Sequence, residues 1–247
     1  MVSTQNLDAL LSINDLKKVC KAIAVLDAII CQEWEYRFYS YNSKWAEAEE
    51  CATMRTGGGD EYHILFNQYG AVINGFAHES EMSPWYLVEN TEKVPETLLE
   101  KFQSFFRENS TVKEEKFILW GGLYDNLPIE FHEFNYGEPI ISIGTTFCIW
   151  RKFSCEKWHI GNIEFPNDDY KDGSEDLLKL LDGDAKKYQE HAEGFDFDKI
   201  PLKYIKHIYS GEVLDETIIR KINPDLEDWD LLISDLEEIG YPHNIKL

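Results

Sequence analysis

The hydrophobic positions near the start of the chain repeat with the period of an α-helix. Apolar residues recur every three or four positions over 13–30, which is the spacing of a helix that buries one face. The apolar stripe consists of Ile13, Leu16, Val19, Ile23, Leu26 and Ile30. Ser12 and Asp15 have the spacing of a capping box. The pattern therefore predicts a first helix that begins directly after Ser12.

The segments that follow predict a strand, a second helix and a hairpin. In 34–41, aromatic residues alternate with charged ones, which is the period of a half-buried strand. Over 42–54 the apolar positions are spaced as on a helix, and the glycines that begin at Gly57 would end it. Two apolar runs, 61–67 and 71–77, are separated by a short polar link, so we expect a β-hairpin there.

The rest of the chain predicts further strands and then only helices. A third helix is expected over 95–109, where a proline opens an apolar stripe. Segments rich in β-branched and aromatic residues predict strands over 116–124, 129–134, 139–153 and 155–165. Beyond an acidic loop, helical patterns cover 174–181, 184–195, 200–211, 215–223 and 226–240. The expected fold is α+β, with a mainly antiparallel sheet flanked by helices over 1–166 and an all-helical C-terminal region over 167–247 packed on it.

The composition narrows the class of protein and of partner. Hydrophobic residues make up 43% of the 247 residues, enough to form a core despite a net charge of −22. The negative charge is shared equally between 1–166 and 167–247, so it is not confined to a tail. A field of this sign repels nucleic-acid phosphates and anionic lipids and attracts basic proteins. We expect no nucleic acid and no membrane as partner, and a basic protein if the charge serves binding at all.

The cysteines and the start of the sequence indicate a compartment. Five cysteines form an odd set without regular spacing, which predicts unpaired thiols in a reducing environment. The first residues show no basic segment followed by an apolar run, and no stretch approaches the length of a membrane span. We therefore expect a cytoplasmic protein without a membrane anchor.

Three consecutive glycines, Gly57 to Gly59, raise the question of phosphate binding. A phosphate loop has a strand before its glycines and a helix after them, followed by Lys and Ser or Thr. Here the predicted order is helix, glycines, strand, and Asp60 and Glu61 would repel a phosphate. The glycines are therefore predicted to turn the chain, with a positive φ at Gly57 or a neighbour.

A polar cluster around this turn is the best candidate for a site. If 61–77 forms a hairpin, its two ends lie side by side and Asp60 becomes a neighbour of His78. The cluster consists of Arg55, Asp60, Glu61, His78 and Glu79. It can bind a ligand or partner, with Arg55 compensating the carboxylates, or it can be a salt-bridged turn that only fixes the hairpin. Both interpretations stay open.

Sequence motifs for catalysis, metals or cofactors are incomplete. A zinc-protease helix would need a second histidine at fixed spacing from His78, and the acidic loop has Tyr170 and Lys179 where a calcium loop needs oxygen ligands. There is no Gly-x-Ser-x-Gly motif, and Cys155 near His159 has no recognisable third partner. We assign no catalytic residue, no metal ligand and no cofactor.

One stretch resembles a family of uncharacterised bacterial proteins. The shared features are Met-Arg, a glycine-rich Asp/Glu turn, a hairpin and Gly-Phe-x-His-Glu-Ser, which stand here at Met54, Arg55, 57–61 and 75–80. The segment 222–242, INPDLEDWDLLISDLEEIGYP, is similar to the end of the same family. Some members resemble immunity or accessory proteins of bacterial toxin systems. The resemblance implies such a role but supplies no activity to transfer.

Two functions follow as hypotheses. The first is a non-catalytic cytoplasmic protein whose acidic surface docks a basic partner, as an immunity protein docks a basic toxin. The second is a small-molecule hydrolase or ligand sensor. In that case His78 would act as a general base, and Asp60, Glu61 and Glu79 would orient it or hold a metal.

Overall fold

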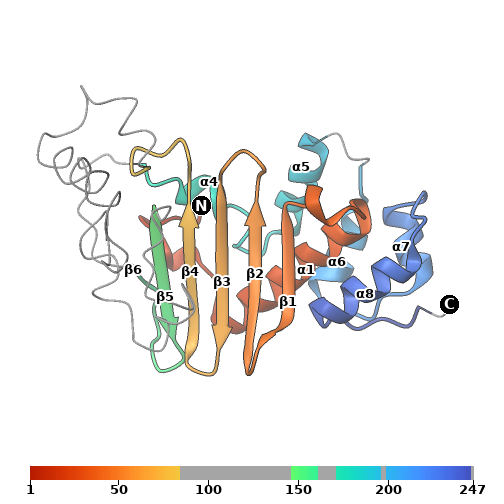
Figure 1. Ribbon diagram of the computed structural model, residues 1–247, viewed down its shortest axis with the longest axis horizontal. Helices are drawn as coiled ribbons and strands as arrows, with labels where there is room; N and C mark the ends of the chain where they lie inside the picture. Colours follow the sequence, from red (N-terminus) through yellow and green to blue (C-terminus); the bar gives the residue numbers. More distant parts are fainter. Residues whose placement is uncertain (84–145, 161–170, 196–198, 246–247) are drawn as a thin grey trace, which may run out of the picture.

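The structure is a computed structural model that describes residues 1–83, 146–160, 171–195 and 199–245. Its central element is a six-stranded antiparallel sheet in which the strands lie side by side in chain order (Figure 1). The strands are β1 Tyr39–Ala46, β2 Glu49–Arg55, β3 Glu61–Asn67, β4 Gly70–Phe76, β5 Phe147–Lys152 and β6 His159–Ile160. With the helices described below, the predicted α+β class is confirmed.

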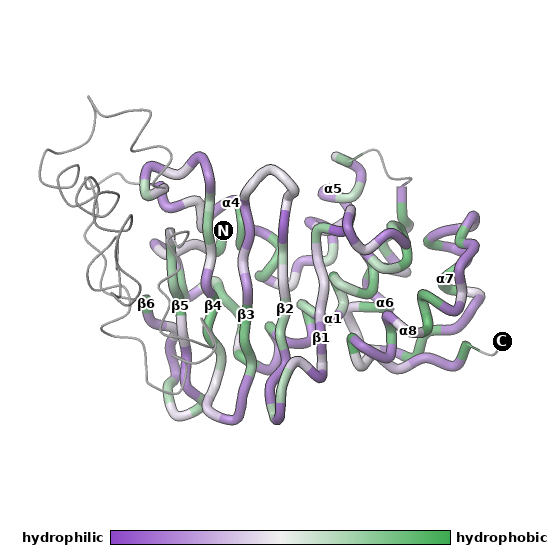
Figure 2. Tube along the Cα trace, viewed as in Figure 1, coloured by the Kyte–Doolittle hydropathy of each residue, from purple (hydrophilic) through white to green (hydrophobic). Residues whose placement is uncertain are grey.

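The first long helix, α1 (Ile13–Ile30), begins where the sequence predicts. The side chain of Ser12 accepts a hydrogen bond from the backbone N–H of Asp15 and so caps the helix. α1 packs against the sheet in one contiguous core. At the centre of that core lies a row of residues paired across five strands, Tyr41, Ala52, Ile64, Ile73 and Ile149. Figure 2 shows hydrophobic segments in the strands and in α1, and hydrophilic segments in most of the turns.

Residues 42–54 form a β-hairpin, so the predicted second helix is wrong. β1 and β2 pair across a turn at Glu47 and Ala48, where Ala48 has a φ of +59°. The apolar spacing that suggested a helix also fits a strand, because Ala52 and Met54 alternate into the core. The hydrogen-bonded pairing of β2 with both β1 and β3 selects the strand over the helix. Tertiary contacts often override local propensity in this way.

The strand predicted over 34–41 begins only at Tyr39. Residues Trp34–Tyr36 form a short 3-10 helix, η2, and the side chains of Trp34 and Tyr36 are exposed. Arg37, which the alternation placed on a polar face, is buried. The local alternation is misleading here because Arg37 is held inside by Asp235, which lies 198 positions away in the sequence.

The C-terminal region is helical, as predicted. Its helices are α4 Ser174–Leu177, α5 Ala185–Gly194, α6 Leu202–Tyr209, α7 Glu216–Ile222 and α8 Trp229–Ile239, and a short 3-10 helix, η1 (Leu7–Ala9), precedes α1. α8 lies against β1, the edge strand, where Ser43 Oγ donates to the carbonyl of Glu238 at 2.7 Å. Since an open sheet edge invites pairing with another chain, α8 protects the sheet at this side.

Some predictions fall outside the described residues. These are the helix over 95–109 and the strands over 116–124 and 129–134; the boundary between 166 and 167 also stays a prediction. The strands predicted over 139–153 and 155–165 lie partly outside, and their described parts contain β5 and β6. All five cysteines are free thiols, as predicted. In the described part of the chain, none of the helices combines the length and the apolar composition that a membrane span requires.

A buried carboxylate joins α1, β1 and α5. Asp27 accepts hydrogen bonds at Oδ2 from the backbone N–H groups of Phe38 and Tyr39, at 3.0 and 2.8 Å, and at Oδ1 from the hydroxyl of Tyr188 at 2.7 Å. Burial raises the pKa of Asp27 from 3.8 to about 6, and these hydrogen bonds and nearby Arg37 oppose that shift. The sequence pattern over 13–30 gave no signal that one polar residue of α1 would lie inside.

The raised pKa of Asp27 predicts how stability changes with pH. Between about pH 4 and pH 6 the folded protein keeps a proton that the unfolded chain has released, so this group lowers the free energy of unfolding as the pH rises. Asp27→Asn removes the titration and can keep the contacts, because its amide oxygen accepts the two backbone bonds and its N–H donates to Tyr188.

Urea unfolding of both proteins between pH 4 and pH 8 checks this. The difference in unfolding free energy, wild type minus Asp27→Asn, should fall by on the order of 2 kcal/mol across the window and then stay constant. A difference that is the same at every pH contradicts the assignment.

Candidate functional site

The three glycines lie in the tight turn between β2 and β3. Gly57 and Gly59 have φ values of +76° and +105°, in the region that favours glycine. The backbone N–H of Thr56 donates to the carbonyl of Asp60 at 3.0 Å and closes the turn. The predicted positive φ is confirmed, whereas the helix predicted before the glycines is a strand.

The hairpin of β3 and β4 brings Asp60 next to His78, as its topology predicts. Glu61 pairs with Phe76 at the open end of the hairpin, and the backbone N–H of His78 donates to Asp60 Oδ1 at 2.7 Å. Nδ1 of His78 lies 3.0 Å from Oε1 of the exposed Glu79. Asp60 therefore fixes the backbone just beyond β4, and Glu79 stands beside the imidazole.

The backbone of Arg55 lies beside the turn cluster, but its side chain contacts Trp34. It pairs with Glu61 across β2 and β3. Its guanidinium donates to the carbonyl of Trp34 at 2.7 Å and stacks 3.7 Å from the centre of the Trp34 ring. Among the described residues, Arg55 forms no ion pair with Asp60, Glu61 or Glu79. The turn thus carries three carboxylates, and Arg55 holds Trp34.

Ser80, the last residue of the Gly-Phe-x-His-Glu-Ser stretch, has a structural role. It is buried, donates through Oγ to the carbonyl of Lys171 at 2.6 Å and accepts from the N–H of Met82 at 2.9 Å. Because both partners are backbone groups, this part of the stretch is a hydrogen-bonded turn that anchors the loop before α4. The structural interpretation of the turn therefore holds for Ser80.

A polar pocket of about 230 Å³ lies between residues 3–5 and 171–176. The buried carboxylate in its wall, Asp172, accepts hydrogen bonds from the hydroxyls of Thr4 and Ser174, so its charge is satisfied within the fold. Over the described ranges, no three side chains of His, Cys, Asp or Glu are arranged to hold a metal ion.

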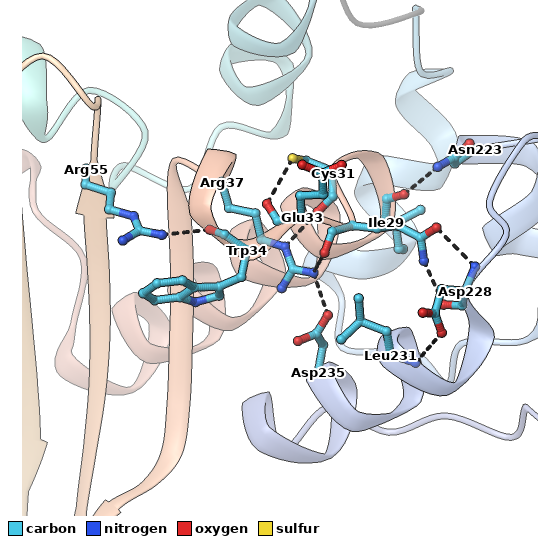
Figure 3. A network of polar contacts seen from close by, with 11 residues as sticks. Ile29, Cys31, Glu33, Trp34, Arg37, Arg55, Asn223, Asp228, Leu231 and Asp235 are labelled. Carbon is cyan, nitrogen blue, oxygen red and sulfur yellow. Dashed lines mark hydrogen bonds and ion pairs between the residues drawn. The ribbon is translucent and has the colours of Figure 1, made fainter.

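A charged network that sequence reasoning missed joins η2 to α8 (Figure 3). Buried Arg37 donates to the carbonyls of Cys31 and Gln32 at 2.7 and 2.8 Å, and to the carboxylate of Asp235 at 2.6 Å. The side-chain amide of Gln32 donates to the carbonyl of Asp228 at 2.7 Å and accepts from its N–H at 3.2 Å. Although 198 residues separate Arg37 from Asp235, the two segments are fixed side by side.

Around this network the chain presents an acidic surface with exposed apolar groups, which we call the η2–α8 surface. It consists of Glu33, Trp34, Glu35, Tyr36, Asp228, Asp230 and Leu231. Trp34 and Tyr36 are 55% and 66% exposed, although Arg55 covers one face of the Trp34 ring. The run Glu-Trp-Glu-Tyr is the available sequence signal, but its alternation also predicts a strand.

No family model, no curated protein and no solved structure matches this chain. The family resemblance noted in the sequence therefore stays a prediction. A functional conclusion rests on the geometry and charge of the turn cluster and of the η2–α8 surface.

The glycine turn gives a matched test of backbone strain. Gly57→Ala should cost about 1 kcal/mol of unfolding free energy, because the added Cβ has open space but the backbone lies in the left-handed region. Gly58→Ala is the control. It lies next in the chain without that φ, and its added Cβ would lie 3.5 Å from the nearest atom, Thr56 Oγ1. Its cost should stay within about 0.5 kcal/mol. Equal losses in urea unfolding would show that the φ of Gly57 is not what requires glycine.

Proposed function

We propose that this chain is a non-catalytic cytoplasmic binding protein whose η2–α8 surface docks a basic protein. The observation that supports this most directly is the fixed exposure of Trp34 and Tyr36 among carboxylates that form no ion pair with any described residue. The sequence resemblance favours an immunity protein that neutralises a basic toxin as the specific form of this role.

The first support is the state of the acidic groups. Elsewhere, a half-buried carboxylate such as Glu50 binds two cations, Lys17 and Lys21, at 2.8 and 3.0 Å. The four acids of the η2–α8 surface form no ion pair with any residue that the structure describes, although Asp228 also caps α8 by accepting from the backbone N–H of Leu231 at 2.9 Å. Lysines or arginines of a partner would form ion pairs with these acids. Such complementary charge speeds association and disfavours acidic competitors.

The second support is the rigidity of the exposed aromatic groups. Trp34 is held by a stacked guanidinium and by a hydrogen bond from Arg55 to its carbonyl. The neighbouring Arg37 and Gln32 fix the backbone on either side of η2 to α8. Tryptophan and tyrosine are the residues that contribute most at protein interfaces, and a preorganised position lowers the entropy cost of binding.

The same charge argues against other partner classes. A net charge of −22 opposes contact with nucleic-acid phosphates and with anionic lipid headgroups. The runner-up function, a hydrolase or ligand sensor at the turn cluster, has less support because Asp60 is engaged by the backbone of His78. We therefore place the binding function at the η2–α8 surface and give the turn cluster the role of an acidic rim.

Capture of the partner at low salt tests the proposal. Immobilised protein should retain a basic protein from the native host, and retention should fall as the salt concentration rises because rim ion pairs are screened. The double variant Trp34→Ser/Tyr36→Ser should weaken binding of the isolated partner by about 30-fold or more, as expected for loss of a central aromatic contact.

Trp45→Ser is the matched control, since Trp45 is 56% exposed at the other end of β1. It should bind the partner like the wild type. Failure to recover any specific basic protein, or equal binding by the double variant and the control, would contradict the proposal. Thermal-shift measurements with nucleotides, sugars and divalent ions probe the runner-up, which gains support only from a selective stabilisation that is lost in His78→Ala.

A further inference from the structure

The opposite end of the sheet carries a second set of exposed aromatic residues. In a sheet whose strands follow in chain order, the turns after β1, β3 and β5 all lie at the same end, as Figure 1 shows. At or next to each of these three turns lies one large exposed aromatic side chain, Trp45, Tyr69 and Phe153, which are 56%, 46% and 53% exposed. We call these three residues the turn-end row.

The turn-end row is symmetric about its centre. Tyr69 belongs to the turn between β3 and β4, and the other two turns lie two strand positions away on either side. With a strand spacing of about 4.8 Å, each step is about 10 Å. The backbone N–H of Phe153 donates to the carbonyl of Tyr69 at 2.9 Å, which fixes these neighbouring turns to each other.

The charges around the turn-end row differ from those of the rest of the chain. Lys44 and Glu47 lie beside Trp45, and Glu156 and Lys157 lie in the turn after β5; all four are exposed and none forms an ion pair with another described residue. Among the exposed charged residues, each flank therefore carries one acid and one base, in a chain whose net charge is −22.

We infer that the turn-end row is the interface with a second copy of this chain, in an end-to-end dimer with two-fold symmetry. A two-fold axis that passes through the central turn, perpendicular to the plane of the sheet, places Tyr69 against Tyr69 of the other copy and Trp45 against Phe153. The same axis sets Lys44 against Glu156 and Glu47 against Lys157. A surface that matches itself in this way is what a symmetric dimer requires.

Electrostatics favour contact of two copies at this end over contact through the η2–α8 surface or the turn cluster. The η2–α8 surface and the turn cluster are acidic, so contact between copies there would bring like charges together. In the end-to-end arrangement those surfaces are separated by the length of two sheets. Seven-residue strands such as β3 and β4 are about 23 Å long, which exceeds the Debye length of about 8 Å in physiological salt.

The available area sets the expected strength. Three aromatic side chains that are about half exposed offer roughly 100 Å² each, so two copies bury about 600 Å² from them. Stable interfaces bury at least about 1,200 Å², so the polar residues of the turns must supply the remainder. The dimer is therefore weak, with a dissociation constant on the order of 100 μM. This interface is independent of the site for a basic partner.

Sedimentation equilibrium of the full chain over about 5 to 500 μM in physiological salt tests the inference. The wild type should change from monomer to dimer across this range. The triple variant Trp45→Ser/Tyr69→Ser/Phe153→Ser should stay monomeric with an unchanged circular dichroism spectrum. Trp34→Ser/Tyr36→Ser, at the opposite end, should dimerise like the wild type. A wild type that is monomeric at 500 μM, or a dimer that survives the triple variant, would overturn the inference.

A charge swap tests the two-fold register without removing an aromatic group. Lys157→Glu should raise the dissociation constant several-fold, because it faces Glu47 of the other copy. The double variant Glu47→Lys/Lys157→Glu should restore the wild-type value. If the double variant dimerises no better than the single one, the pairing across the axis is wrong.

Discussion

The structure depends on two buried charges where α1 ends and β1 begins. Asp27 accepts the N–H groups that lead into β1 and reaches α5 through Tyr188. Arg37 donates to the carbonyls just after α1 and reaches α8 through Asp235. A buried charge without its partners is costly, so each of these contacts restricts where the neighbouring element can lie. One short segment thereby fixes the start of the sheet and the position of two C-terminal helices.

The same constraint shapes the surface. Because Arg37 is directed into the junction, the residues before it turn as a 3-10 helix, and Trp34 and Tyr36 stay outside. A charge inside and two large aromatic rings outside invert the usual distribution of residue types. Such departures concentrate at functional sites, where stability is not the only requirement. Arg55 stacks on Trp34 and so fixes the position of this ring on the η2–α8 surface. Because Arg55 is used in this way, it does not neutralise the carboxylates of the turn cluster.

Local patterns predicted the elements whose partners are close in sequence. α1, the hairpin of β3 and β4 and the C-terminal helices follow from period and capping, and the contact of Asp60 with His78 follows from the hairpin. The apolar spacing of residues 42–54 fits both a helix and a strand, and only the pairing of β2 with β1 and β3 decides for the strand. The η2–α8 surface could not be predicted, since the ion pair of Arg37 and Asp235 spans 198 residues and leaves no local signal.

A double-mutant cycle on Arg37 and Asp235 tests the dependence of the fold on this buried ion pair, with Arg37→Ala, Asp235→Ala and the double variant compared by urea unfolding. Fluorescence and circular dichroism would report the tertiary structure and the helices separately. If the two buried charges hold the fold together, the chain should unfold in one cooperative transition, Arg37→Ala should lose about 3 kcal/mol, and the two residues should show a coupling energy of about 1 to 3 kcal/mol. Additive losses, or C-terminal helices that unfold in a separate transition from the sheet, would contradict it.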